Sequence, residues 1–508
     1  MTAHLEDPGA LTVPVAGDPA AAGEHMLALE LVARLCSELA DAGVLYNHWK
    51  SNEAIGRSMS GDNDLDLLVA RRDHGRFLEV LARLGFKAAS LPHAREVPSV
   101  VHYYGLDARS GRLVHVHAHF RLVLGDDTTK NFWLPVERAY LESSTRDGLF
   151  PLPAPEFELA VLVLRLVLKH ATWDAMLQMR GALAASERRE LAWLEARTDW
   201  DTVEGVVREH LPFVLDVWPL CRRAVEPGCP RHLRVRASLA LTQALQACAR
   251  RGAAHDQTLR LVRRVTWGGK RYLLRKPTRK RLVAGGAVVA LVGGDGAGKS
   301  TAVEGVSSWL SRAFVVERVH LGRPPKSLTT LTVKGALVTG RKFGLFPELA
   351  EPTTPPDDLT RPPSTAWLAW HTLTARDRHR LYARARRVAA NGGIVVCDRF
   401  PLTELRSMDG ARTTWAEGMP GLSRLGSRLV RLEARYYAAF GRPDVLAVLR
   451  VDPEVAVLRK HDEEEHYVRR RSTEVWQTSW EPPVVVVDAG QPAATVLADL
   501  RRTVWERL

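Results

Sequence analysis

A glycine-rich segment holds the residues with the clearest chemical role in this sequence. It reads Gly293-Gly294-Asp295-Gly296-Ala297-Gly298-Lys299-Ser300-Thr301 and contains the pattern G-x-x-x-x-G-K-S. Glycines let such a loop curl so that its backbone N–H groups point at a phosphate chain. Lys299 would then reach the β- and γ-phosphates, and the Ser300 hydroxyl would ligate Mg²⁺. The segment predicts binding of ATP and Mg²⁺; the alternative is a glycine-rich turn with a solvated lysine.

A second polar group follows an apolar run further along the chain. Ile394-Val395-Val396-Cys397 leads directly into Asp398-Arg399-Phe400. In open α/β sheets, ligands bind at the carboxyl ends of the strands. Asp398 could orient Mg²⁺ or the acceptor oxygen, and Arg399 could neutralise a phosphate. A purely structural Asp-Arg ion pair is the alternative.

The amino-terminal half contains a candidate site of its own. In Asp64-Leu65-Asp66-Leu67-Leu68-Val69 two acids alternate with apolar residues, so a strand would present both carboxylates on one face. Such a pair can hold Mg²⁺ ions that bridge nucleotide phosphates. A later candidate strand, 113–122, places His115, His117 and His119 on one face, which also suggests a metal site of different chemistry.

The elements expected around these residues indicate two halves of different organisation. An apolar strand at 288–292 precedes the glycine-rich loop, and an amphipathic helix at 302–310 follows it. Beyond residue 285, strands and helices alternate, as a parallel sheet with crossover helices requires. Residues 155–260 are helical in pattern almost throughout. The eight prolines of residues 324–363 predict a long mobile insertion near the site.

Composition sets limits on partners and location. A chain of 508 residues should form two or three domains, and its net charge of +13 favours anionic partners. Ten basic residues and no acidic ones lie between Arg260 and Arg281. This strip is either a solvated connector or a docking surface for phosphate-rich ligands or a membrane surface. Its few aromatic residues argue against a nucleic-acid stacking platform.

Cysteine content and hydropathy add to these limits. Five cysteines without C-x-x-C spacing fit a protein of the reducing cytoplasm. The apolar runs fall short of the roughly 18 residues that a membrane-spanning helix needs, and the amino terminus does not have the pattern of a signal peptide. Residues 1–24 read as a disordered tail.

The motifs of the carboxyl-terminal half resemble those of thymidylate kinases. The glycine-rich loop is similar to the phosphate loop of that family, and Asp398-Arg399-Phe400 resembles its Asp-Arg-aromatic motif. The resemblance implies that Arg378, Arg399 and Phe400 bind the phosphoryl acceptor and that Asp398 contacts the metal. It also places arginines in a lid over the transferring phosphate, with Arg459, Arg469, Arg470 and Arg471 as candidates. Arg469 and Arg470 are the expected catalytic pair, together with Lys299, Asp398 and Arg399.

One feature departs from the family pattern. The aromatic and glutamine residues that would hold thymine are not recognisable after Phe400. Hydrogen-bonding groups give an enzyme its strongest discrimination between substrates, so the acceptor stays open. A phosphorylated sugar or a lipid of surface-polymer assembly is the alternative to a nucleoside monophosphate.

The amino-terminal half resembles the nucleotidyltransferase superfamily. In that superfamily a Gly-Gly or Gly-Ser pair precedes an Asp-x-Asp strand, here Asp64 and Asp66 as metal ligands. Ser51 fills the second position of the pair, but Lys50 stands where glycine is expected. His117 is the closest match to the third carboxylate. The domain is therefore a competent transferase, a degenerate domain that binds nucleotide or supports the kinase, or a histidine-ligated metal site.

The predicted organisation has five parts and an α/β fold. We expect a tail at 1–24, a nucleotidyltransferase-like α+β domain at 25–154, a helical extension at 155–260, a basic linker at 261–284 and a P-loop kinase domain at 285–508. The predicted activity is ATP- and Mg²⁺-dependent phosphoryl transfer to an anionic acceptor. A different class, an ATP-regulated nucleic-acid-binding protein that uses the basic strip, is the remaining alternative.

Overall fold

The computed structural model divides the chain into two compact units, Met1–Thr278 and Arg279–Leu508. It describes residues 28–91, 96–146, 148–170, 183–273, 279–342, 362–402, 404–405, 410–461 and 463–508. The predicted tail at 1–24 lies outside these residues, as does the stretch 343–361 of the predicted insertion.

Unit 2 is built on a parallel sheet, as the alternation of strands and helices predicts. Its strands run in the order β10-β11-β9-β12-β13, and every neighbouring pair is parallel. Their bounds are β9 Ala287–Gly293, β10 Val316–His320, β11 Ile394–Asp398, β12 Val445–Arg450 and β13 Val485–Asp488. The fully apolar β9 is buried along its whole length at the centre, as expected for a strand covered on both faces.

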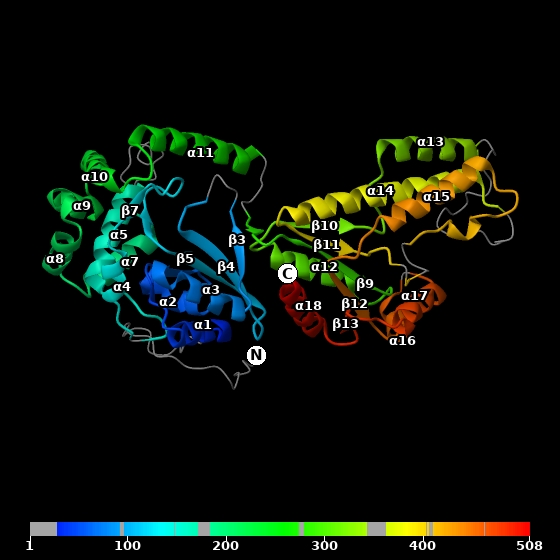
Figure 1. The fold of residues 1–508 in the computed structure, drawn as a ribbon, viewed down its shortest axis with the longest axis horizontal. Helices are drawn as coiled ribbons and strands as arrows, with labels where there is room; N and C mark the ends of the chain where they lie inside the picture. Colours follow the sequence, from blue (N-terminus) through cyan, green and yellow to red (C-terminus); the bar gives the residue numbers. More distant parts are fainter. Residues whose placement is uncertain are drawn as a thin grey trace. The chain divides into compact units, whose positions relative to one another are not determined.

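Helices cover both faces of this sheet (Figure 1). Helices α14 and α17 pack on one face, where their apolar side chains meet alternate residues of β9, and α12 and α18 pack together on the other. The helices of unit 2 are α12 Lys299–Leu310, α13 Leu328–Lys342, α14 Thr365–Ala390, α15 Arg424–Ala438, α16 Pro453–Arg459, α17 Glu465–Gln477 and α18 Ala493–Arg507; a short strand, β8 (Arg281–Leu282), begins the unit.

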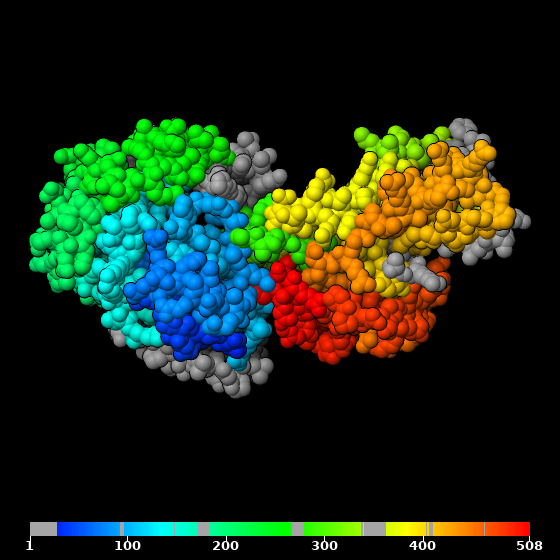
Figure 2. All heavy atoms as spheres, viewed as in Figure 1, coloured from blue at the N-terminus to red at the C-terminus, as the bar shows by residue number. Residues whose placement is uncertain are grey.

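Helix α14 is much longer than the strands it covers. Its 26 residues span about 39 Å, whereas the five residues of β11 span about 17 Å. Because α14 ends just before β11 begins, its amino-terminal half must project past the carboxyl ends of the strands. In the space-filling view, α14 and α15 (yellow to orange) extend above α16–α18 (orange-red to red), and the two groups adjoin over the sheet (Figure 2).

Unit 1 contains a mixed sheet whose strands run in the order β1-β2-β5-β4-β3. Strands β2 and β5 are parallel, and the other pairs are antiparallel. The bounds are β1 Tyr46–His48, β2 Leu65–Val69, β3 Lys87–Ser90, β4 Val100–Asp107 and β5 Arg112–His119. Helices α1 (Glu30–Asp41) and α3 (His74–Arg83) bury one face of the sheet, with α2 (Ile55–Met59) between them in sequence.

A helical layer completes unit 1, in agreement with the periodicity of residues 155–260. Its core is α5 (Pro155–His170), which is buried along most of its length. The remaining elements are the hairpin β6 Leu122–Leu124 and β7 Phe132–Leu134 and the helices α4 Glu137–Glu142, α7 Ala185–Glu195, α8 Trp200–His210, α9 Trp218–Val225, α10 Arg231–Ala244 and α11 Ala253–Leu273.

The basic strip differs from the expected linker. Helix α11 continues through Leu273, so the predicted boundary at 260 falls inside a helix. Basic side chains do not oppose helix formation, and Arg260 pairs with Asp256 one turn earlier at 3.1 Å. In the described part of the chain, no helix is both long and apolar enough to cross a membrane. All five cysteines are free.

Candidate functional site

The glycine-rich loop lies at the carboxyl end of β9 and opens into helix α12. Gly296 and Gly298 have φ angles of +79° and +75°, in the left-handed region that glycine adopts without strain. Lys299 begins α12, and Ser300 and Thr301 occupy its exposed first turn. The loop therefore presents backbone N–H groups and two hydroxyls at the positive end of a helix, which suits an anion.

Two later helices approach this loop so closely that only glycine fits. A Cβ on Gly294 would lie 2.7 Å from the Cα of Ser472 in α17, and one on Gly296 would lie 2.5 Å from the carbonyl oxygen of Ala456 in α16. On the side of Gly298, by contrast, a Cβ would meet no described atom within 4 Å. The loop is thus backed by α16 and α17, and a ligand can approach it at Gly298.

Three cations converge on the carboxylate of Asp295 inside the loop. Arg471 Nη1 donates to Asp295 Oδ2 at 2.7 Å, Arg399 Nη2 to Oδ1 at 3.4 Å, and Lys299 Nζ lies 3.8 Å from Oδ1. Burial raises the pKa of Asp295, but the hydrogen bond from Arg471 and the charges of Lys299 and Arg399 outweigh it, so the pKa is lowered. Asp295 is therefore an anchor that gathers positive charge at the loop.

Lys299 is buried within this group. Its Nζ donates to the carbonyl oxygen of Gly294 at 2.5 Å, so the side chain folds back over the loop that it follows. A desolvated ammonium at a helix start interacts strongly with any phosphate that enters, because the local dielectric constant is low. The placement agrees with the role that the motif predicts for Lys299.

The Asp-Arg-Phe segment lies beside the loop at the end of β11. Asp398 pairs in register with Leu291 of β9, two residues before Gly293. Arg399 has a φ angle of +63°, rare for a residue with a side chain. This turn directs its guanidinium to Asp295, so the structure brings Arg399 to the glycine-rich loop.

Phe400 and Arg378 have roles that the sequence did not reveal. Phe400 is buried and packs edge-to-face against Tyr382 and Phe440, at centroid distances of 6.0 and 6.1 Å. Arg378 is also buried; its Nε donates to the carbonyl oxygen of Leu321 at 2.6 Å, and it contacts the hydroxyl of Tyr437. Phe400 is therefore part of the core. Arg378 fixes the segment after β10, and its predicted contact with an acceptor stays a prediction.

Among the lid arginines, the structure brings a different residue to the loop than the expected pair. Arg469 forms an ion pair with Glu454 of α16 at 2.7 Å, and Arg470 is exposed. Arg471 reaches Asp295 instead, as described above. Successive residues on a helix point about 100° apart, so the sequence alone could not tell which arginine of Arg469-Arg470-Arg471 faces the loop.

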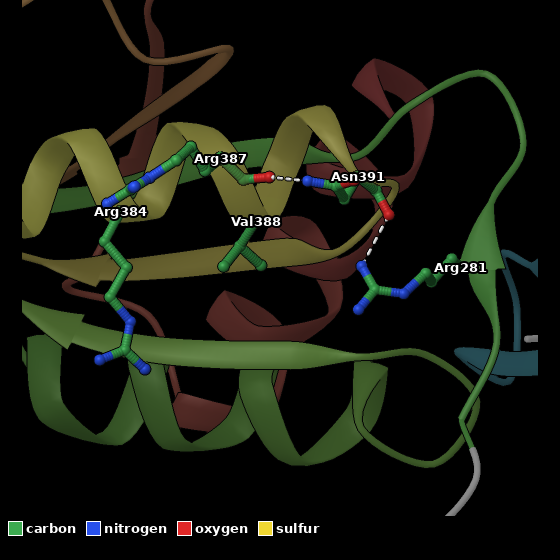
Figure 3. A pocket seen from close by; sticks show the side chains of 5 residues that line it. All are labelled: Arg281, Arg384, Arg387, Val388 and Asn391. Carbon is green, nitrogen blue, oxygen red and sulfur yellow. Dashed lines mark hydrogen bonds between the residues drawn. The ribbon is translucent and has the colours of Figure 1, made fainter.

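A cavity of about 290 Å³ lies elsewhere in unit 2 (Figure 3). Arg281, Arg384, Arg387, Val388 and Asn391 line it. Asn391 follows α14 and precedes β11, so the cavity lies at the amino ends of the strands, whereas the glycine-rich loop lies at their carboxyl ends. Arg281 already donates to the carbonyl oxygen of Asn391 at 2.7 Å, and Arg384 pairs with Glu317 at 2.9 Å. The candidate functional site is therefore the glycine-rich loop and not this cavity.

In unit 1, the predicted carboxylates have separate partners. Asp66 lies in β2 beside His117 of β5, with 3.0 Å between Asp66 Oδ1 and His117 Nδ1. Asp64 precedes β2, and its Oδ1 lies 2.5 Å from His115 Nδ1. Lys50 Nζ, from the position where glycine was expected, lies 2.8 Å from Asp66 Oδ1. Asp66 is therefore adjacent to His117, whereas the ion pair of Asp64 is with His115.

Comparison with models of known protein families finds no match to this chain, and comparison with curated proteins finds no significant relative. The resemblances to thymidylate kinases and to nucleotidyltransferases stay predictions that rest on the motifs.

Proposed function

We propose that unit 2 catalyses Mg²⁺-dependent phosphoryl transfer from ATP to an anionic acceptor, with a P-loop kinase fold of the thymidylate-kinase type. The observation that carries the proposal is the convergence of Lys299, Arg399 and Arg471 on Asp295 within a glycine-rich loop. Phosphoryl transfer needs little covalent chemistry from the protein. Positioning and charge neutralisation account for most of the catalysis.

The position of the loop in the sheet supports this function. The loop leaves the central strand β9, with β11 on one side and β12 on the other. At such a position the carboxyl ends of the strands form a crevice in which nucleotides bind. Helix α14 projects past this edge, so it is available to form one wall of an acceptor site. Unit 1 could supply a second nucleotide site or only support the kinase.

The residues divide into those that would bind ATP, the phosphoryl donor, and those that would bind the phosphoryl acceptor. Loop N–H groups and Lys299 would hold the β- and γ-phosphates, Ser300 and Asp398 would hold Mg²⁺, and Arg471 would neutralise the transferring phosphoryl group. Asp295 keeps Arg399 and Arg471 in place before the nucleotide arrives, so less reorganisation is needed during the reaction. Arg399 stands on the β11 side, where we expect the phosphate of the acceptor.

The acceptor is best described by its charge. We propose a nucleoside monophosphate as the first candidate because of the resemblance to thymidylate kinases. A phosphorylated sugar or lipid is the second candidate. It is favoured by the burial of Phe400 in the core, which removes the aromatic side chain of the motif as a stacking partner for a base.

ADP release with a panel of acceptors tests the proposal. The full chain is incubated with ATP, Mg²⁺ and, in turn, each nucleoside monophosphate and a set of sugar phosphates. Lys299→Ala should abolish turnover, whereas Lys334→Ala, which removes an exposed lysine of α13, should not change it. Equal turnover by the Lys299→Ala variant and the wild-type chain would refute the kinase assignment.

A further inference from the structure

Three potential metal ligands meet on one face of the unit 1 sheet. They are Asp66 of β2 and His117 and His119 of β5, and their ligand atoms all lie within 4.8 Å of one another. Strands β2 and β5 are hydrogen-bonded neighbours, with Asp66 opposite His117 and Leu68 opposite His119. Side chains two residues apart on a strand share a face, so the three groups are placed together by the strands themselves.

The distances within the group fit a first-row transition metal. His117 Nδ1 lies 3.0 Å and His119 Nε2 lies 3.6 Å from Asp66 Oδ1. For a tetrahedral ion with bonds of about 2.0–2.1 Å, neighbouring ligand atoms lie about 3.3 Å apart. The two measured separations bracket this value, so an ion could be bound with small side-chain shifts.

His119 gives an independent indication of a ligand. Its side chain is 94% buried, at 6% exposure, and both ring nitrogens are buried without a hydrogen-bond partner in the described structure. Burying a polar atom without a partner costs free energy, so such groups call for an explanation. A metal ion bound to one of these ring nitrogens would supply the missing partner.

We propose that Asp66, His117 and His119 bind a divalent transition metal ion of the zinc class. Two imidazoles and one carboxylate suit zinc, whereas Mg²⁺ prefers oxygen ligands throughout. Three protein ligands leave a fourth tetrahedral position for water. The site is independent of the kinase site of unit 2, because all its ligands lie in unit 1.

Lys50 would compete with this ion for the carboxylate of Asp66. Its Nζ lies 2.8 Å from the same Asp66 oxygen that would ligate the metal. A metal ion must therefore share or displace the ammonium, and removing the lysine charge should strengthen metal binding.

Calorimetric titration of the untagged full chain with ZnCl₂, after dialysis against a chelator, tests the site. The wild-type chain should bind Zn²⁺ at this site, and His119→Ala should weaken the affinity by at least about tenfold. His232→Ala is the matched control, because His232 is an exposed histidine of α10. It should leave the affinity unchanged.

A variant that binds Zn²⁺ more tightly distinguishes an effect on the metal site from a folding defect. Lys50→Met should bind Zn²⁺ about tenfold more tightly than the wild-type chain, which a misfolded variant would not do. An excess of Mg²⁺ should not displace the Zn²⁺. Equal Zn²⁺ affinity of the wild-type and His119→Ala chains, or weaker binding by Lys50→Met, would overturn the proposal.

Discussion

Alanine at Gly296 tests whether α16 supports the glycine-rich loop. Both Gly296 and Gly298 lie in the left-handed region, at φ +79° and +75°, so alanine is strained at either position. The surroundings differ: a Cβ at Gly296 would lie 2.5 Å from the carbonyl oxygen and 2.9 Å from the Cα of Ala456, whereas one at Gly298 meets no described atom within 4 Å. Gly298→Ala is therefore the matched control for backbone strain.

The expected loss of stability follows from the strain of the backbone and the close contact with Ala456. Left-handed backbone costs an L-residue about 1–2 kcal/mol, and alanine recovers about 0.4–1 kcal/mol through the unfolded chain. Gly298→Ala should therefore destabilise unit 2 by about 1 kcal/mol. The contact with Ala456 is to backbone, which cannot turn away, so overpacking should add about 1–3 kcal/mol. We expect about 2–4 kcal/mol for Gly296→Ala.

Hydrogen exchange in increasing urea measures this loss within unit 2. Peptides from β9 and α12 report the stability of the sheet, and peptides from α16 report the contact itself. Gly296→Ala should lower the urea midpoint of both and should loosen α16 most. Equal midpoints for Gly296→Ala and Gly298→Ala would show that α16 does not pack against the loop as described.

Further expected outcomes concern the charged groups. Burial, the largest cause, raises the pKa of Glu158 from 4.5 to about 8. The folded chain therefore favours the protonated acid, and the free energy of unfolding falls as pH rises through this interval. Thermal unfolding at pH 5.5 and pH 8 should show a smaller loss for Glu158→Gln than for the wild-type chain. Arg471→Ala should lower kcat by about 100-fold or more, while Arg470→Ala should change it less than about threefold, as measured by ADP release. Arg399→Ala should raise the apparent KM for the acceptor and leave the calorimetric affinity for ATP near normal.

Local features were predictable from the sequence. The strand, glycine-rich loop and helix around Lys299 form a contiguous segment whose spacing alone specifies its geometry. The placement of His115, His117 and His119 on one face was also predictable, because side chains alternate along a strand. In both cases, short-range geometry determines the placement. The contact between Asp66 and His117 depends in addition on the pairing of β2 with β5, which joins residues 51 positions apart.

Features that depend on tertiary packing were not predictable. The contact between Arg471 and Asp295 depends on the rotation of α17 about its axis, and three consecutive arginines leave that rotation undefined. The burial of Phe400 depends on Tyr382 and Phe440, which come from elements distant in sequence. The continuation of α11 through Leu273 was missed because a run of basic residues is compatible with either a helix or a solvated connector.

The left-handed backbone of Arg399 has a consequence for how this chain can change over evolutionary time. A glycine there would relieve a conformational cost of about 1–2 kcal/mol. Arg399→Gly should therefore retain or raise folding stability, yet it would remove a guanidinium from the loop. The strained backbone of Arg399 therefore coincides with the contact between its guanidinium and Asp295 of the loop. At this position, we expect substitutions that stabilise the fold to lower the activity.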